Sequence, residues 1–230
     1  MQLLFVASAP MEYTGMLQFA EAKQSKLLGC VWARNGHLNG HNTLMVANGA
    51  GWGRAAAAVD EACREFHPDA VISTGFCGAL DPKLGVSTVV VGTAVRGQGE
   101  FPCKLGSFLR AHARGVVLSM DHIVRTAAEK RRLHAQGAAV VEMEAAGVAS
   151  RAQALGLPFY CIRAVSDPAG EDLANDFNAA LRPDGQFDTM RIFRHSLSRP
   201  VARVPELFRL RRNCLRAAKT LGEFFADCQF

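Results

Sequence analysis

The sequence predicts an α/β fold with a central sheet that is covered by helices on both faces. Short apolar runs of strand length alternate with Ala-rich or capped segments of helical length, an order typical of this class. About half of the 230 residues are apolar and a fifth are charged, which supports a sizeable buried core. The chain shows no internal repeat and no Pro/Gly-rich linker, so we expect one catalytic domain over residues 1–188.

Each expected helix has a start or stop signal. The first is Ala-rich and ends before Pro68, and the third is stopped by Gly156. The second begins with the capping pair Thr126 and Glu129. Glycines predict that the strand beginning at residue 69 ends in a loop at 75–78. The expected strands are 2–8, 43–48, 69–74, 86–95, 115–119, 138–141 and 159–165, and the expected helices are 54–66, 126–136 and 142–155.

Positive charge is concentrated near the C-terminus. The net charge is +5, and ten Arg or Lys residues lie between residues 182 and 219. We expect a basic helical extension over 189–230 that packs on the same domain, with its helices broken near Pro200 and Pro205. Such a segment can bind nucleic acid or an anionic membrane, or it can be a solvated helical face.

Several classes of protein are disfavoured. No run approaches ~20 uninterrupted apolar residues, and the first residues lack the basic start of a secretory signal. The seven cysteines are odd in number and form no CxxC pair, which indicates reduced thiols in the cytoplasm. The GxGxG run at 49–53 lacks the spacing of a dinucleotide site, and His37 and His41 are expected on a hairpin without a third metal ligand. We therefore expect no cofactor and no metal.

Two carboxylates interrupt the small, apolar run 138–149, at Glu142 and Glu144. Burying a carboxylate without a partner is costly. These side chains therefore face solvent at a strand–helix junction, lie at a helix N-terminus where acidic residues are favourable, or meet a ligand.

Two further charged groups belong to the expected strand over 159–165. Arg163 is a lone charge inside the strand and needs anionic partners, whereas Asp167 follows its carboxyl end. Glu12 similarly follows the first strand. A turn at Asp167 and helix capping by Glu12 are the simpler alternatives. Ligands of open parallel sheets bind beyond the carboxyl ends of strands, so these acids are candidate site residues.

Taken in order, these motifs resemble the purine nucleoside phosphorylase / uridine phosphorylase superfamily, and most of all its hydrolytic branch, the 5'-methylthioadenosine/S-adenosylhomocysteine nucleosidases. The resemblance rests on VEMEA at 141–145, RAVSD at 163–167 and TGFCG at 74–78, together with the loop that carries Glu12. It implies a central mixed sheet partly closed into a barrel and flanked by helices. It also implies a homodimer or higher homo-oligomer with sites near subunit interfaces.

The resemblance implies three catalytic roles. Asp167 would protonate or hydrogen-bond N7 of the leaving purine, Glu12 would activate water, and Arg163 would orient Glu12 and the water. The residues implied around the substrate are Glu144 on the ribose hydroxyls, Met143 against the sugar, His122 and Ile123 beside the adenine, and Glu142, Ser166, Gly75 and Phe76 within the same motifs.

The nucleophile is inferred from two positions at which this chain differs from the superfamily members that use phosphate. Superfamily members that use phosphate carry an Arg two residues before the first glycine of the TGFCG-like motif and a Ser or Thr just after it, where this chain has Ser73 and Phe76. Water is therefore favoured. A phosphorolytic enzyme that binds phosphate through Arg54, and a non-catalytic nucleoside- or nucleic-acid-binding protein, are the alternatives. Phe76 also replaces the small Ser of typical nucleosidases, which leaves the substituent at the 5' position of the nucleoside open.

The C-terminal region resembles the hopanoid-associated members of the superfamily, which act on an adenosyl group attached to a triterpenoid lipid. The resemblance rests on DGQF at 184–187, the Arg-rich run 191–216, SRP at 198–200 and VPEL at 204–207. It implies a purine nucleoside substrate with a hydrophobic 5' group and a basic tail near the inner face of a membrane, and it implies no nucleic acid partner.

Overall fold

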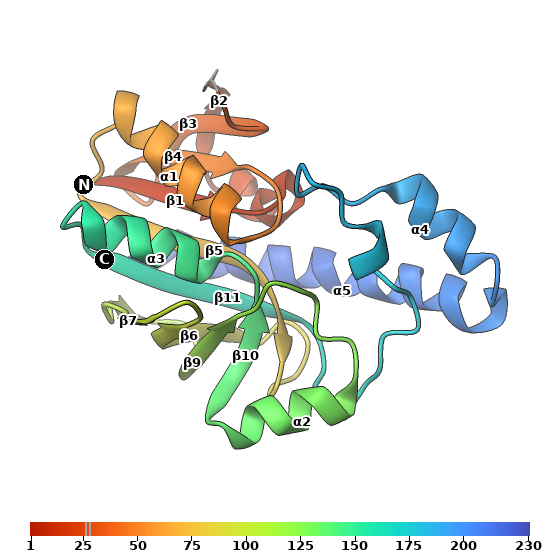
Figure 1. Ribbon diagram of the computed structural model, residues 1–230. Helices are drawn as coiled ribbons and strands as arrows, with labels where there is room; N and C mark the ends of the chain where they lie inside the picture. Colours follow the sequence, from red (N-terminus) through yellow and green to blue (C-terminus); the bar gives the residue numbers. More distant parts are fainter. Residues whose placement is uncertain (26, 28) are drawn as a thin grey trace.

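The computed structural model describes residues 1–25, 27 and 29–230 (Figure 1). The strands are β1 (Gln2–Ala7), β2 (Glu21–Gln24), β3 (Trp32–Leu38), β4 (His41–Ala47), β5 (Ala70–Ala79), β6 (Val89–Arg96), β7 (Glu100–Pro102), β8 (Ser107–Phe108), β9 (Ala113–Ser119), β10 (Ala138–Glu142), β11 (Phe159–Asp167) and β12 (Cys228–Gln229). The α-helices are α1 (Trp52–Glu65), α2 (Ala127–Ala135), α3 (Ala145–Ala154), α4 (Thr189–Ser196) and α5 (Pro200–Ala226). Short 3-10 helices are η1 (Pro10–Tyr13), η2 (Met16–Gln18) and η3 (Asn178–Ala180).

One large mixed sheet organises the chain, and part of it closes into a barrel. The strand order is β10-β9-β6-β11-β5-β1-β4-β3-β2, and β10 also pairs with β5. This second pairing closes β10, β9, β6, β11 and β5 into a five-stranded ring, while β1, β4, β3 and β2 continue as an open sheet. The expected α/β fold, with a mixed sheet partly closed into a barrel, is confirmed.

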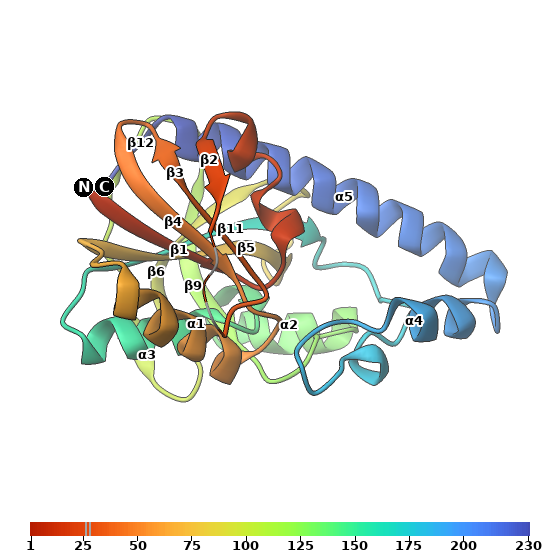
Figure 2. The same ribbon diagram turned by 90° about the horizontal axis from the view of Figure 1, so that it is seen from above.

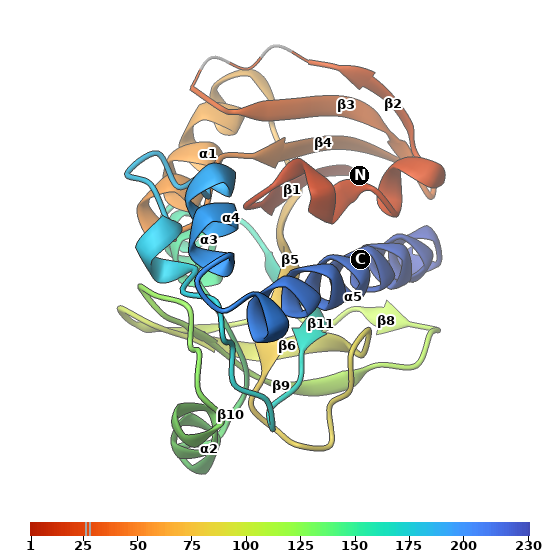
Figure 3. The ribbon, with the colours of Figure 1, turned by 90° about the vertical axis from the view of Figure 1, so that its right-hand side faces the viewer.

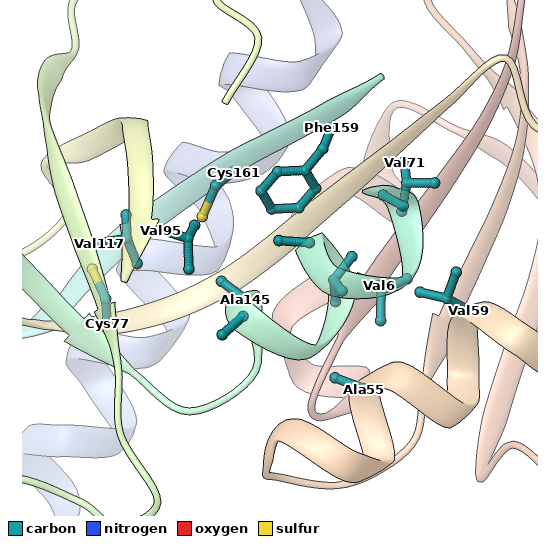
Figure 4. Packing of buried hydrophobic residues seen from close by; sticks show 14 of the residues in the cluster. Val6, Ala55, Val59, Val71, Cys77, Val95, Val117, Ala145, Phe159 and Cys161 are labelled. Atoms are coloured by element: carbon teal, nitrogen blue, oxygen red, sulfur yellow. The ribbon is translucent and has the colours of Figure 1, made fainter. Parts of the chain in front are cut away.

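Strands β1 and β4 of the open part are buried on both faces, which explains their continuously apolar runs. In β1, Leu4 and Val6 belong to a cluster with residues of α1 and α3, whereas Leu3 and Phe5 belong to a cluster with residues of α5. Helices α1 and α3 lie on one side of the sheet and α5 on the other (Figure 2). Figure 4 shows the first cluster, where Val6 lies among side chains of the neighbouring elements.

Helix α5 packs closely on the segment that follows β1. A Cβ atom on Gly222 would lie 2.1 Å from the carbonyl carbon of Gly15, and one on Gly15 would lie 1.9 Å from the oxygen of Ala218. The backbones therefore touch, and only glycine fits at either position. Helix α4 and the first turns of α5 lie away from the open sheet (Figures 1 and 3).

The expected break near Pro205 is wrong. Helix α5 begins at Pro200, a first helical position that suits proline, and continues through Pro205. Pro205 lies near the N-terminal end of the helix, so its missing N–H removes a single bond there, and packing on the sheet stabilises the remaining turns. Of the described residues, no helix combines the length and apolar character that crossing a bilayer requires.

The loop predicted at 75–78 is also wrong, because β5 continues to Ala79. The strand pairs with β1 over its first residues and with β10 at Gly78 and Ala79. Gly75 has a φ of +131°, a conformation that other residues rarely adopt. The glycines therefore let the strand leave the open sheet and enter the barrel. The hairpin expected at His37 and His41 is present, since β3 and β4 are antiparallel neighbours.

Candidate active site

Glu12 lies in η1, directly after β1, and is 3% exposed. Its Oε2 accepts hydrogen bonds from the Ser8 N–H (2.8 Å), the Ser8 hydroxyl (2.8 Å) and the Ala9 N–H (2.9 Å). Its Oε1 accepts one from the Phe76 N–H on β5 (2.7 Å). All these partners are donors, so both oxygens of the carboxyl group accept hydrogen bonds. The hydrogen bond to the Ala9 N–H matches the capping interpretation, and the bond to the Phe76 N–H holds Glu12 against β5.

Arg163 is fully buried in β11, and its anionic partner is Glu142 at the end of β10. The guanidinium also donates to the Thr74 carbonyl (2.7 Å) and the Ser73 hydroxyl (2.6 Å). Burial alone would lower the pKa of Arg163, but the charge of Glu142 raises it above its ordinary value. Arg163 is therefore a permanent cation that links β11, β5 and β10.

Gly75 lets Arg163 and Glu12 approach each other, because it has no side chain. A Cβ atom on Gly75 would lie 2.2 Å from Glu12 Oε1 and 2.9 Å from Arg163 Nη1. Both charged groups therefore occupy the space in which a side chain at this position would lie, so only glycine leaves room for them. The ion pair of Arg163 is with Glu142, and among the described residues no Arg163–Glu12 pair falls within 4.0 Å.

The two acids of the VEMEA motif have different surroundings. Glu142 accepts the N–H groups of Glu144 (3.0 Å) and Ala145 (2.8 Å), and also the Ser119 hydroxyl, at the start of α3. Glu144 accepts the N–H of Gly51 (3.0 Å). Burial and then the charge of Glu142 raise the pKa of Glu144 to about 8. Glu144 can therefore hold a proton near neutral pH.

Asp167 ends β11 and is held by a lysine from another element. Its Oδ2 lies 2.6 Å from Nζ of Lys130 on α2, whose side chain is fully buried. Its Oδ1 accepts a hydrogen bond from the Ser166 hydroxyl (3.0 Å). Asp167 and Glu12 both act on the thiol of Cys214 on α5, where burial and then these charges raise the thiol pKa to about 12. Glu12 accepts the Phe76 N–H, and a Cβ atom on Gly78 would lie 2.9 Å from Asp167 Oδ2, so both carboxylates border β5.

The remaining expected site residues lie on β5, at the end of β10 and in the loop before α2. Met143 is buried between β10 and α3, and Phe76 is partly buried against the cluster beneath α5. His122 and Ile123 lie in the loop before α2. The backbone N–H and carbonyl of Ile123 are bound by the Asn178 amide (2.7 and 2.9 Å). His122 lies 2.6 Å from Asp121, and this hydrogen bond raises its pKa.

Sequence reasoning missed Lys130, Ser119 and Gly51. Lys130 had a detectable signal, because Ala127, Lys130 and Leu133 are spaced to form one buried helical face. A lysine inside an apolar stripe requires a buried partner. Ser119 and Gly51 carried no such signal, since their roles depend on which loops meet. Within the described residues, no group of three metal-binding side chains is present.

Two solved structures share the fold of this chain. The 5'-methylthioadenosine/S-adenosylhomocysteine nucleosidase of S. pneumoniae superposes with a TM-score of 0.70 and 21% identity, covering 99% of both chains. The futalosine hydrolase of Helicobacter pylori gives a TM-score of 0.67 and 17% identity, covering 97% of this chain and 96% of that one. The fold and its buried carboxylates thus define an α/β chain with nucleosidase-like architecture.

Sequence comparisons then identify the family. A 5'-methylthioadenosine/S-adenosylhomocysteine nucleosidase of Chromohalobacter salexigens is 26% identical over 189 residues, covering 69% of this chain and 80% of the relative. One of Staphylococcus saprophyticus is 27% identical over 176 residues, covering 64% and 77%. The family model of the Phosphorylase superfamily matches residues 33–108 and 100–187. The chain belongs to the Phosphorylase superfamily and is an enzyme of that superfamily.

Proposed function

We propose that this enzyme hydrolyses the N-glycosidic bond of a purine nucleoside and releases the base, most simply adenine. The observation that carries the proposal is the pair of carboxylates on distant strands, Glu12 after β1 and Asp167 at the end of β11. Both border β5, since Glu12 accepts the Phe76 N–H and a Cβ atom on Gly78 would lie 2.9 Å from Asp167 Oδ2. The curated relatives, which are nucleosidases for 5'-methylthioadenosine and S-adenosylhomocysteine, support the same reaction.

The proposed roles follow from the charge that develops during bond cleavage. As the C1'–N9 bond breaks, the base gains electrons, and a proton from Asp167 at N7 lets it leave as a neutral molecule. The sugar becomes oxocarbenium-like, so nearby carboxylates stabilise the transition state more than the substrate. Glu12 accepts the proton of the attacking water. Arg163 fixes the backbone of β5 on which Glu12 depends, through Ser73 and Thr74.

The substrate contacts are proposed from the resemblance and the geometry. Glu144 would hold the ribose hydroxyls and Met143 would pack on the sugar. Glu144 extends its carboxyl to the Gly51 N–H at the start of α1, so one oxygen is fixed. His122 and Ile123 would border the base, with Ser166 and Glu142 supporting Asp167 and Arg163.

Water is favoured over phosphate because candidate phosphate ligands are engaged. The N–H of Phe76 is bound to Glu12, and Ser73 is bound to Arg163. Arg54, the cation of the phosphorolytic alternative, donates to the Pro183 carbonyl (2.6 Å). A phosphate would also lie against the Glu12 carboxylate and be repelled.

The nucleophile is tested by following adenine release from adenosine and its 5'-substituted analogues, with and without inorganic phosphate. Hydrolysis predicts full turnover in phosphate-free buffer and free ribose sugars as products. Strict dependence on phosphate, with a sugar 1-phosphate as product, supports phosphorolysis instead. No turnover combined with salt-sensitive retention of RNA or DNA supports a binding protein.

A hydrophobic 5' group is proposed together with peripheral contact at the inner face of a membrane. The observation that favours it is a surface of α4 and α5, here called the basic surface, that exposes apolar and basic side chains together. No carboxylate of the described residues lies within 4.0 Å of its five arginines. The basic surface consists of Phe193, Leu197, Phe208, Leu215, Arg191, Arg194, Arg211, Arg212, Arg216 and Lys219.

Vesicle sedimentation tests the membrane proposal. Binding to vesicles that contain phosphatidylserine, but not to phosphatidylcholine alone, is expected, and the double substitution Arg211→Glu, Arg212→Glu should abolish it. Equal sedimentation with both vesicles, or no binding, would remove the membrane from the proposal. A cytoplasmic homodimer or higher homo-oligomer, implied by the superfamily resemblance, is tested separately by sedimentation velocity.

A further inference from the structure

Lys130 is a fully buried lysine that the proposed reaction has not yet used. Its Nζ lies 2.6 Å from Asp167 Oδ2 and 2.8 Å from the Pro168 carbonyl oxygen. A buried ammonium is costly unless it is paired and hydrogen-bonded. Nothing in the packing of α2 requires a charge at this position, since its neighbours on the buried face are Ala127 and Leu133.

We propose that Lys130 is a positioning residue that fixes Asp167 and makes it a stronger acid toward the departing base. The inference rests on the proposed function, in which Asp167 protonates N7. Lys130 itself touches neither the base nor the sugar; it acts through the carboxyl group of Asp167.

The contacts leave one oxygen of Asp167 for the base. Oδ2 is held by Lys130, and a Cβ atom on Gly78 would lie 2.9 Å from it, so this side is closed. Oδ1 lies beside the Ser166 hydroxyl, which also reaches the Cys77 carbonyl (3.2 Å). A hydroxyl has one hydrogen, so it can donate to Asp167 as a carboxylate or turn to Cys77 when Oδ1 carries the proton.

The step balances as follows. The proton moves from Asp167 Oδ1 to N7 while the C1'–N9 electron pair leaves with the base. Water forms the new C1'–O bond and gives its proton to Glu12, so the enzyme holds the same number of protons before and after. Asp167 changes from neutral to anionic, and its attraction to the Lys130 ammonium grows during the step. The contribution of Lys130 therefore appears in the transition state and in kcat.

Other titratable groups near Asp167 cannot replace Lys130. The charge of Asp167 acts on two thiols, those of Cys77 on β5 and Cys214 on α5. Burial raises the pKa of both thiols, so both are neutral near pH 7. Among the described residues, Lys130 is the cation within 4.0 Å of Asp167.

The test compares Lys130→Met with Lys130→Arg by pH profiles of kcat. In Lys130→Met, kcat for adenosine should fall about 10- to 100-fold, as expected when one charge-assisted hydrogen bond is lost. Without the cation Asp167 holds its proton more tightly, so the limb on which activity falls with rising pH should move to higher pH. Lys130→Arg keeps the charge and should keep this limb near its original position. Lys130→Gln replaces the Met variant if the latter does not fold.

A second substrate separates this inference from the proposed function. Para-nitrophenyl riboside has a leaving group that departs as a stable anion, so Lys130→Met should hydrolyse it at nearly the original rate. Equal losses on both substrates with an unmoved pH limb would show that Lys130 is merely structural. Unchanged adenine release by Asp167→Asn would instead overturn the proposed function, whatever Lys130 does.

Discussion

Two carboxylates of the candidate site, Glu12 and Asp167, are held by different kinds of partner. Glu12 is surrounded by neutral donors, namely the backbone N–H groups of Ser8, Ala9 and Phe76 and one hydroxyl. Asp167 is held by the full positive charge of Lys130 and a single hydroxyl. The first arrangement is built from loops that must be correctly placed, whereas the second depends on one side chain of α2.

The difference lies in the charge of the partners, which are neutral donors at Glu12 and an ammonium group at Asp167. The donors that converge on Glu12 bring no formal charge next to the proposed water. A cation beside Asp167 stabilises the carboxylate that remains after the proton has left.

The substitution Asp167→Asn tests most directly whether Asp167 and Glu12 have different roles. We expect kcat for adenosine to fall about 10²- to 10⁴-fold with a small change in KM, because the acid acts mainly in the transition state. Hydrolysis of para-nitrophenyl riboside should be largely preserved. Steady-state kinetics on the two substrates measures both effects, and near-normal adenine release would show that Asp167 is not the acid.

Glu12→Gln should behave differently on the same two substrates. Water must be activated whichever group leaves, so we expect a fall in kcat of about 10²- to 10⁴-fold on both. The amide keeps the shape of the carboxyl but brings its own N–H group toward donors, so unfolding temperatures should be compared as a control. Selective loss on adenosine alone would reverse the roles assigned to the two carboxylates.

Gly222→Ala tests the support beneath the Glu12 loop. The added methyl group would meet the backbone of Gly15, and such overpacking costs about 1–3 kcal/mol of unfolding free energy. Adenine release should fall as well, because the loop that carries Glu12 shifts. Gly53→Ala is the matched control, since a Cβ atom there meets nothing within 4 Å. Urea unfolding that shows equal stability for both variants would contradict the close packing.

The smallest effect is expected from Glu144→Gln in the ligand-free enzyme. The folded pKa of Glu144 is about 8, above its ordinary value of 4.5, so the folded state holds this proton more tightly. The stabilisation of the folded state by this proton is therefore complete below pH 4.5 and is lost as the pH rises toward 8. The unfolding temperature should decline less across this range in Glu144→Gln than in the original chain. Parallel curves would show that Glu144 ionises normally.

Much of the fold followed from local patterns in the sequence. Continuous apolar runs gave the central strands, and Thr126 caps α2 through the Glu129 N–H, as expected. The expectation that Arg163 needs an anionic partner is met by Glu142. These features depend on neighbours in sequence or on the high cost of an unpaired buried charge.

Features that depend on distant pairing could not be predicted from the residues. Closure of the barrel requires β5 to bend at Gly75 and pair with β10, and two glycines alone indicated a loop. The short strands β2, β7, β8 and β12 carry too few apolar residues to stand out. Whether the assigned residues perform their catalytic roles stays a prediction.

The contact between Gly15 and Gly222 has a practical consequence for anyone who shortens the protein. Cutting the chain after residue 188 would leave Phe5 and Ile72 without the aromatic residues Phe224 and Phe225 that share their cluster. The fragment would expose this apolar cluster to water. It would also lose the helix that packs against the segment following Glu12. The C-terminal helix is thus a structural requirement of the enzyme, whatever its outer face touches.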